Sequence, residues 1–376
     1  MARLSNLPTW GRRAAVIGTA AGVVAAGAAV GLAAERYAVG RSFRNADDPW
    51  ADEPFGELRG TVVPVTADDG VDLHVEVEGP LPDRRGSRTG RGGRGGPPVT
   101  VVFCHGLALN QDSWHHQRRD LSDLGRLVFW DQRGHGRSGR GPMEHATIDQ
   151  LGHDLLAVLE ATAPTGPVVL VGHSMGGMTI MALAEQHPEL FGDRVIGVAL
   201  IATSPGRLAE VTFGVPAAAG RALRRAAPGA LAALNRRPAL VARTRRLGAD
   251  IEFVLTKRYS FATDVPPSLV RFVQEMHDSA PLDVLAELFP AFDAHDKLDS
   301  LEVLNGVETL IMGGEQDAMT PADHSREMVE RVPGAELAIL PEAGHLLMLE
   351  HHDVVTDHRR SLVERALRAH PASSAG

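Results

Sequence analysis

The sequence has little cysteine, since Cys104 is the only one among 376 residues. No disulfide can form within the chain, and a zinc site built from cysteine thiolates is not expected. Positive charge is also in deficit: 38 Lys and Arg residues stand against 47 Asp and Glu residues, for a formal net charge of −9. Because nucleic-acid binding relies on an excess of basic groups, this balance argues against nucleic acid as the main partner.

Charge is missing altogether from residues 14–34, an Ala- and Gly-rich run of 21 positions that follows Arg12 and Arg13. A helix that crosses a membrane needs about 20 such residues. We therefore expect a retained signal anchor at 14–34 behind a basic flank at 1–13, which places the protein at the cell membrane with a single N-terminal span. A cleaved export signal is the first alternative, and a buried helix of a soluble protein is the second. Lys and Arg are balanced on the two sides, so they do not decide the orientation.

Short apolar runs alternate with helical patterns from residue 99 onward. The stretches "VTVVFCHG" and "PVVLVGHS" have the composition of buried strands, whereas residues 147–162 place their apolar side chains on one helix face. This alternation predicts an α/β fold with a mostly parallel central sheet flanked by helices. Before it, residues 60–79 predict two extended stretches joined by a turn at Asp69-Gly70.

Residues 207–300 interrupt the alternation. They are rich in Ala, Arg and Pro and mostly helical in pattern, and eleven Lys and Arg face three Asp and Glu between residues 207 and 258. Helices inserted between two strands of such a sheet are expected to form a cap over the carboxyl ends of the strands. The predicted divisions are a linker at 35–59, a first part of the core at 60–206, the helical cap at 207–300, a second part of the core at 301–368 and a tail at 369–376.

A glycine-flanked serine stands where a strand gives way to a helix. Gly172 to Gly176 read G-x-S-x-G around Ser174, with an apolar strand before and a helical pattern after. In this setting the glycines permit a sharp turn that exposes the serine hydroxyl above the sheet. Ser174 is therefore the predicted nucleophile.

A serine hydroxyl needs a base to remove its proton and an acid to orient that base. In a parallel sheet both are expected on loops at strand ends, in the order serine, acid, histidine. Asp317 ends the strand pattern "LIMGGEQD" and His345 follows "AILPEAG", so they are the predicted acid and base. Asp323 and Glu315 are lesser candidates for the acid.

The stretch "FCHGLALN" at 103–110 supplies a second loop at the same edge. The backbone N–H of Leu107 and that of Met175 are the predicted donors of an oxyanion hole. His105 and His173 flank this site, and we interpret both as packing or loop-bracing residues.

Other residues near these motifs are interpreted as structural. Cys104 is expected to be a small buried side chain, Asp131 and Arg133 to brace the loop "DQRGHGRS", and His351 and His352 to be solvated. No cluster of metal-ligating side chains is left over, so neither a metal nor a cofactor is expected.

Five motifs together, "HGLALN", "DQRGHGRS", "GHSMGG", "GGEQDAMTP" and "AGHLLMLE", resemble the α/β-hydrolase fold superfamily in its esterase, lipase and haloperoxidase-like branch. The resemblance covers residues 60–365. It implies the same fold, with a helical cap, and serine at 174 argues against the epoxide hydrolases and dehalogenases, which use aspartate. His352 departs from the family pattern, which often has proline there.

Neither the oligomeric state nor the length of the acyl chain follows from these residues. The sequence predicts a membrane-anchored serine hydrolase that cleaves a small-molecule or lipid ester through an acyl-enzyme intermediate. Acyl transfer, perhydrolysis and hydrolysis of a carbon–carbon bond stay open, because the same triad serves all three. Outside enzymes, the alternatives are a ligand-binding member with an idle triad and a membrane scaffold.

Overall fold

The computed structural model describes residues 48–79, 99–211, 225–226, 229 and 255–370. The predicted basic flank and membrane anchor, together residues 1–34, lie outside this part of the chain. Among the described helices, none has both the length and the apolar composition that crossing a membrane requires.

Eight strands form one sheet in the order β1-β2-β4-β3-β5-β6-β7-β8. β1 and β2 form an antiparallel hairpin at the predicted Asp69-Gly70 turn, β2 also runs antiparallel to β4, and the other neighbours are parallel. The mostly parallel sheet expected from the sequence is thus confirmed. The strands are β1 (Thr61–Thr66), β2 (Asp72–Glu78), β3 (Thr100–Cys104), β4 (Arg126–Trp130), β5 (Val168–His173), β6 (Val195–Ile201), β7 (Glu308–Gly314) and β8 (Glu336–Leu340).

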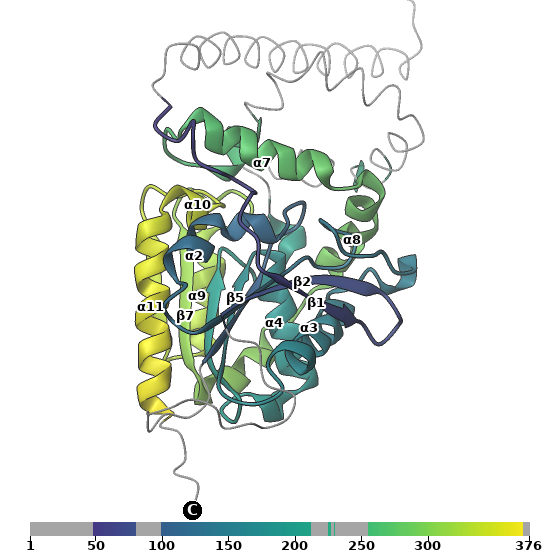
Figure 1. Cartoon of the computed structure of the whole chain (residues 1–376), viewed down its shortest axis with the longest axis vertical. Helices are drawn as coiled ribbons and strands as arrows, with labels where there is room; N and C mark the ends of the chain where they lie inside the picture. The colour runs from purple at the N-terminus through teal and green to yellow at the C-terminus, as the bar shows by residue number, and fades with distance from the viewer. Residues whose placement is uncertain (1–47, 80–98, 212–224, 227–228, 230–254, 371–376) are drawn as a thin grey trace, which may run out of the picture.

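Helices cover both faces of the sheet (Figure 1). One face packs against α3, α4 and α9, and the other packs against α11, with α2 and α10 beside it. These helices are α2 (His115–Asp120), α3 (Ile148–Thr162), α4 (Met175–Gln186), α9 (Ala322–Arg331), α10 (Leu347–Glu350) and α11 (His352–Ala369).

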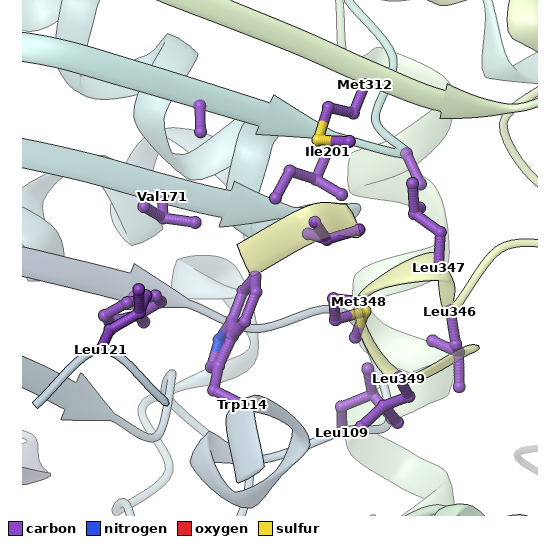
Figure 2. Packing of buried hydrophobic residues seen from close by; sticks show 14 of the residues in the cluster. Leu109, Trp114, Leu121, Val171, Ile201, Met312, Leu346, Leu347, Met348 and Leu349 are labelled. Atoms are coloured by element: carbon purple, nitrogen blue, oxygen red, sulfur yellow. The ribbon is translucent and has the colours of Figure 1, made fainter. Parts of the chain in front are cut away.

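The core divides at the sheet because side chains of a strand alternate between its two faces. In β3, Phe103 belongs to the cluster under α11, whereas Val102 and Cys104 belong to the cluster under α3 and α4. Figure 2 shows Trp114 of the short 3-10 helix before α2, Val171 of β5 and Leu346–Leu349 among the side chains of the cluster under α11. Burial of each such side chain stabilises the fold by about 1.5–3 kcal/mol.

The insertion between β6 and β7 contains two described helices, α7 (Pro267–Ser279) and α8 (Leu282–Ala294). Both lie over one end of the sheet in Figure 1. Val284 and Leu288 of α8 join Met175 and Met178 of α4 in a third buried cluster, which fixes the insertion to the first turns of that helix. Much of the predicted cap, residues 212–224 and 230–254, lies outside the described residues.

The described chain begins within the predicted linker, and residues 48–59 pack on the rest of the protein. Phe55 stacks on Phe272 of α7 with ring centroids 4.8 Å apart, and Trp50 lies 5.2 Å from the ring of His116 in α2. Asp48 accepts a hydrogen bond from the backbone N–H of Ser268 at 2.9 Å, in the first turn of α7. This segment, which we call the strap, therefore joins the cap helix α7 to α2.

Candidate active site

Ser174 occupies a strained turn between β5 and α4, with φ 53° and ψ −119°. Such a conformation costs roughly 1–3 kcal/mol and persists only where its surroundings enforce it. A Cβ at Gly172 would lie 2.5 Å from the carbonyl oxygen of Gly176, and one at Gly176 would collide with the backbone of Cys104. The hydroxyl of Thr203 donates to the carbonyl of Ser174 at 2.7 Å and braces the turn. The two glycines thus let the serine stand clear of the sheet.

The structure brings the three predicted side chains of the triad together. His345 Nε2 lies 3.1 Å from the hydroxyl oxygen of Ser174, and His345 Nδ1 lies 2.8 Å from Oδ2 of Asp317. The residues come from the ends of β5, β7 and β8, in the order expected for a parallel sheet. With Nδ1–H donating to the carboxylate, Nε2 is left as the acceptor that faces the hydroxyl.

The carboxylate of Asp317 is fully buried yet ionisable. Burial opposes ionisation, but the neighbouring His345 and the hydrogen bonds from Thr320 outweigh it and hold the pKa of Asp317 below its ordinary value. Oδ1 accepts from the backbone N–H groups of Met319 at 2.7 Å and Thr320 at 3.0 Å, and the Thr320 hydroxyl donates to Oδ2 at 2.7 Å. Asp317 therefore carries a negative charge beside the imidazole at neutral pH.

The other acid candidates lie away from this arrangement. The side chains of Asp323 and Glu315 are 86% and 49% exposed, and both pair with Arg326. Neither contacts the imidazole of His345, so within the described residues Asp317 is the carboxylate that does.

The loop after β3 lies against the nucleophile. A Cβ placed on Gly106 would lie 3.2 Å from Cβ of Ser174, so the loop backbone approaches the serine closely. Leu107 lines the cavity in front of Ser174, and Met175 is the first residue of α4. Among the described residues, the N–H groups of Leu107 and Met175 donate no hydrogen bond to a backbone carbonyl.

Two buried histidines brace the site. His173 Nε2 donates to the carbonyl of His345 at 2.9 Å, and burial lowers the pKa of His173 to about 3. His105 Nε2 accepts from the backbone N–H of Gln132 at 2.9 Å, and burial lowers the pKa of His105 to about 4. Both rings are neutral at physiological pH and hold backbone groups, which agrees with the interpretation from the sequence.

Among the other residues interpreted as structural, one differs in the structure from the expectation. Cys104 is buried, and Arg133 pairs with buried Asp154, as a loop brace should. His352, however, stacks on His116 with ring centroids 4.0 Å apart and is only partly accessible. The expectation that His352 is solvated is therefore wrong, because α11 begins there and packs its first residue against α2.

A cavity of about 410 Å³ opens in front of Ser174 and His345. Its walls are mostly apolar and come from the loops after β3, β7 and β8, from α4 and from the cap. Apolar lining residues are Leu107, Ala108, Leu109, Met178, Leu208, Leu285, Phe289, Phe292, Met319 and Leu346. A chamber of this kind can hold an apolar acyl or alcohol group beside the hydroxyl.

One group of side chains outside this site has the composition of a metal site. Potential ligand atoms of Glu53, His115 and His116 lie within 4.8 Å of one another. The carboxylate of Glu53 is already held by His115 at 2.8 Å and by Arg119 at 2.9 Å. A guanidinium in contact with the carboxylate disfavours a cation there. We therefore interpret these contacts as ones that hold the strap against α2.

Sequence reasoning missed two residues that shape the site, Thr320 and Glu350. Thr320 lies three positions after Asp317, and its hydroxyl bonds the carboxylate. Glu350 accepts from the backbone N–H of Gly344 at 2.7 Å. Thr320 lies within the motif "GGEQDAMTP", so the sequence contained a signal for it. No motif indicated the contacts of Glu350 with Ala262 and Thr263, where the chain leaves the cap.

A family model of the alpha/beta hydrolase fold matches residues 99–352. The dihydrolipoyllysine-residue acetyltransferase component of an acetoin cleaving system from Pseudomonas putida is 30% identical over 281 residues, which cover 73% of this chain and 67% of that protein. A non-heme haloperoxidase from Rhodococcus erythropolis is 28% identical over 274 residues, covering 70% and 92%.

Among solved structures, a thermophilic esterase from Thermogutta terrifontis is 25% identical, covers 82% of this chain and 99% of its own, and superposes with a TM-score of 0.59. The region matched by the family model holds the sheet from β3 onward, the cap and the whole candidate site. The chain is therefore an enzyme of the α/β-hydrolase fold family.

Proposed function

We propose that this protein is a serine hydrolase that cleaves carboxylic esters through an acyl-enzyme intermediate. The observation that carries the proposal is the hydrogen-bonded series Asp317, His345 and Ser174, with distances of 2.8 Å and 3.1 Å, at the floor of an apolar cavity. The similarity to the Thermogutta terrifontis esterase supports the same reaction class.

In the proposed mechanism, His345 Nε2 removes the proton of Ser174 as the serine oxygen attacks the ester carbonyl carbon. The N–H groups of Leu107 and Met175 stabilise the oxyanion. Collapse of the tetrahedral intermediate breaks the bond to the alcohol oxygen, which takes the proton from His345. Water, deprotonated by the same imidazole, then attacks the acyl-enzyme and releases the acid with Ser174 restored. Asp317 stabilises the imidazolium that forms in both steps.

The test uses a series of p-nitrophenyl esters from acetate to palmitate, with the wild type beside Ser174→Ala. Turnover that depends on Ser174, together with labelling by a fluorophosphonate, is the expected result. Retention of more than a trace of turnover by the alanine variant in a correctly folded state would refute the mechanism. Product analysis with added alcohol or peroxide separates hydrolysis from acyl transfer and perhydrolysis.

We also propose that residues 14–34 anchor the protein in the cell membrane, because this run is uncharged over its full length. Full-length protein is expected to stay in the membrane fraction after carbonate washing, and a variant that lacks residues 1–45 is expected to leave it. Recovery of intact, uncleaved full-length chain in the soluble fraction would contradict the anchor.

A further inference from the structure

The cap wall of the cavity carries polar side chains that the proposed reaction does not use. Besides the triad and its support, the polar lining residues are Tyr259, Ser260 and His277, and all three come from the insertion between β6 and β7. They line a chamber whose other described cap residues are Leu208, Leu285, Phe289 and Phe292. Polar groups in an apolar chamber are costly unless a ligand or water completes their hydrogen bonds.

His277 is the most constrained of the three. It lies in the last turn of α7, and its neighbours Val273 and Met276 are buried in the main core cluster. The backbone carbonyl of His277 accepts from the N–H of Ala280 at 3.3 Å, which fixes the end of the helix. Within the described part of the chain, however, the imidazole nitrogens have no hydrogen-bond partner. The helix that carries His277 is thus fixed by its buried neighbours, and the imidazole nitrogens are left to a ligand in the cavity.

The ring of His277 is uncharged at physiological pH. Burial lowers the pKa of His277 to about 4, and the proximity of His345 acts in the same direction, against the weaker opposite effect of Asp278. A neutral imidazole offers one donor and one acceptor. No Lys, Arg, Asp or Glu is found among the described residues that line the cavity. The donor and acceptor that His277 brings to the chamber are therefore uncharged.

We infer that His277 is a specificity-determining residue that contacts substrate and selects uncharged esters with a hydroxyl group remote from the scissile carbonyl. A hydroxyl both donates and accepts, so it matches a neutral imidazole, and Tyr259 and Ser260 line the same chamber. The apolar remainder of the ester occupies the walls formed by the leucine and phenylalanine side chains. This inference rests on the proposed esterase function.

Ser260 also connects the polar part of the cap wall to the loop after β8, which carries His345. Its backbone carbonyl accepts from the N–H of Leu346 at 2.9 Å, and a Cβ on Gly344 would lie 2.7 Å from the same oxygen. The root of the cap thus lies directly against the residues on either side of His345. A substrate hydroxyl held by the cap is therefore held at a fixed position relative to the base.

The experiment compares matched ester pairs on the full-length protein. On the acyl side the pair is p-nitrophenyl octanoate and p-nitrophenyl 8-hydroxyoctanoate, and on the alcohol side it is propyl octanoate and 1-octanoylglycerol. The mono-p-nitrophenyl ester of suberic acid, which carries a carboxylate, tests the exclusion of charge. The variants are His277→Leu, which removes the hydrogen bond, His277→Gln, which keeps one, and Leu285→Met as a volume-conserving control on the same wall.

Wild type is expected to prefer the hydroxylated ester in at least one pair by about tenfold in kcat/KM, and to turn over the carboxylate ester most slowly. His277→Leu is expected to abolish that preference while the plain ester changes by less than about threefold, and His277→Gln to restore part of it. Leu285→Met is expected to keep the preference.

Equal changes for both members of each pair in His277→Leu, or no hydroxyl preference in wild type, would overturn this inference. Those outcomes leave the esterase proposal standing, because turnover would still depend on Ser174. If no ester is hydrolysed in a Ser174-dependent manner by any variant, the proposed function itself fails.

Discussion

The carboxylate of Glu350 accepts a hydrogen bond from the backbone N–H of Gly344 at 2.7 Å, immediately before His345 in the chain. Its other oxygen accepts from the backbone N–H groups of Ala262 at 2.7 Å and Thr263 at 2.6 Å. One side chain in α10 therefore joins the loop of the proposed base to the root of the cap. Together with the bond between Leu346 and Ser260, the side chain of Glu350 therefore fixes the position of the His345 loop relative to the cap.

We expect Glu350→Gln to lower kcat/KM by about tenfold, since an amide cannot accept at both positions and one N–H group is left unpaired. Glu350→Ala is expected to lower it further and to destabilise the protein by roughly 2–4 kcal/mol. Ester hydrolysis and urea unfolding measure the two effects. Exposed Glu342 lies on the same loop, and Glu342→Gln serves as the control with no change. Wild-type kinetics in Glu350→Ala would contradict the positioning role.

Replacement of Asp317 tests the orientation of the base. In Asp317→Asn the amide oxygen takes the place of Oδ1, which accepts from the N–H groups of Met319 and Thr320. The amide nitrogen then faces His345 Nδ1, so the imidazole loses the acceptor that keeps its proton on that nitrogen. By analogy with serine proteases, kcat is expected to fall on the order of 10³–10⁴-fold with the fold intact. Stopped-flow hydrolysis of p-nitrophenyl esters measures this. Asp323→Asn should leave the rate unchanged. A comparable loss of kcat in that variant would contradict the assignment of Asp317 as the acid.

Acid should weaken the protein through Glu76, a carboxylate in β2 that is 1% exposed. Burial opposes its ionisation, but the N–H of Gly60, the guanidinium of Arg118 and the ring of His74 outweigh this and lower the pKa of Glu76 from 4.5 to about 2. Below about pH 5, Glu76 binds a proton in the unfolded chain but stays ionised in the folded chain. The free energy of unfolding therefore falls as the pH falls. The contribution is roughly 3 kcal/mol at neutral pH and is lost between about pH 5 and pH 2.

The variant Glu76→Gln isolates this contribution. It is expected to be less stable than wild type at pH 7 by about 3 kcal/mol, because buried Arg118 loses its partner at 2.7 Å and keeps the partly exposed Glu78 at 3.3 Å. The difference should shrink as the pH is lowered from 5 towards 3, since wild-type Glu76 then gains its own proton. Urea unfolding at each pH measures it. Exposed Glu364→Gln is the control, and a pH-independent difference would show that Glu76 does not titrate as described.

The strap should stabilise the cap in a measurable way. Pro266 and Pro267 stand at the start of α7 and no nearby side chain caps the helix, so Asp48 supplies the acceptor from more than 200 positions away. Asp48→Ala is expected to reduce stability by about 1 kcal/mol and to speed amide hydrogen exchange in the first turn of α7. Exposed Asp52→Ala is the control. Unchanged exchange in α7 would contradict a capping role.

Residues that carry local chemistry could be found from the sequence, and those that act through distant partners could not. Ser174, Asp317 and His345 each follow an apolar strand pattern, and the carboxyl ends of parallel strands meet at one edge, so their convergence was predictable. The contact of Glu350 with Thr263 spans 87 positions, and nothing in either local sequence indicates it.

The strap and the histidine stack illustrate the same limit. Residues 48–59 have the composition of a linker, yet Trp50 and Phe55 find aromatic partners in α2 and α7 that only the folded chain presents. His352 replaces a residue type that the resemblance led us to expect, and its ring pairs with His116, 236 positions earlier. Composition predicts whether a segment is polar, but packing between distant elements decides whether it is ordered on the core.

Arg359 in α11 provides the last prediction. The residue is 1% exposed, Nε donates to the carbonyl of Val355 at 2.9 Å, and within the described residues Nη1 and Nη2 have no partner. The rings of Trp114 and Phe103, 5.4 Å and 5.9 Å away, offer only cation–π attraction. A buried charge without a counter-ion opposes folding by several kcal/mol, which exceeds such attraction.

Arg359→Met keeps the apolar stem and removes the charge, so we expect it to raise the free energy of unfolding by about 1–3 kcal/mol, measured by urea denaturation at pH 7. Arg368→Met, on the same helix with a side chain that is 67% exposed, is the control and should change stability by less than about 0.5 kcal/mol. A loss of stability in Arg359→Met would contradict this reasoning. It would mean that water or an anion completes the hydrogen bonds of Nη1 and Nη2, because a satisfied guanidinium is the one form of this residue that stabilises the core.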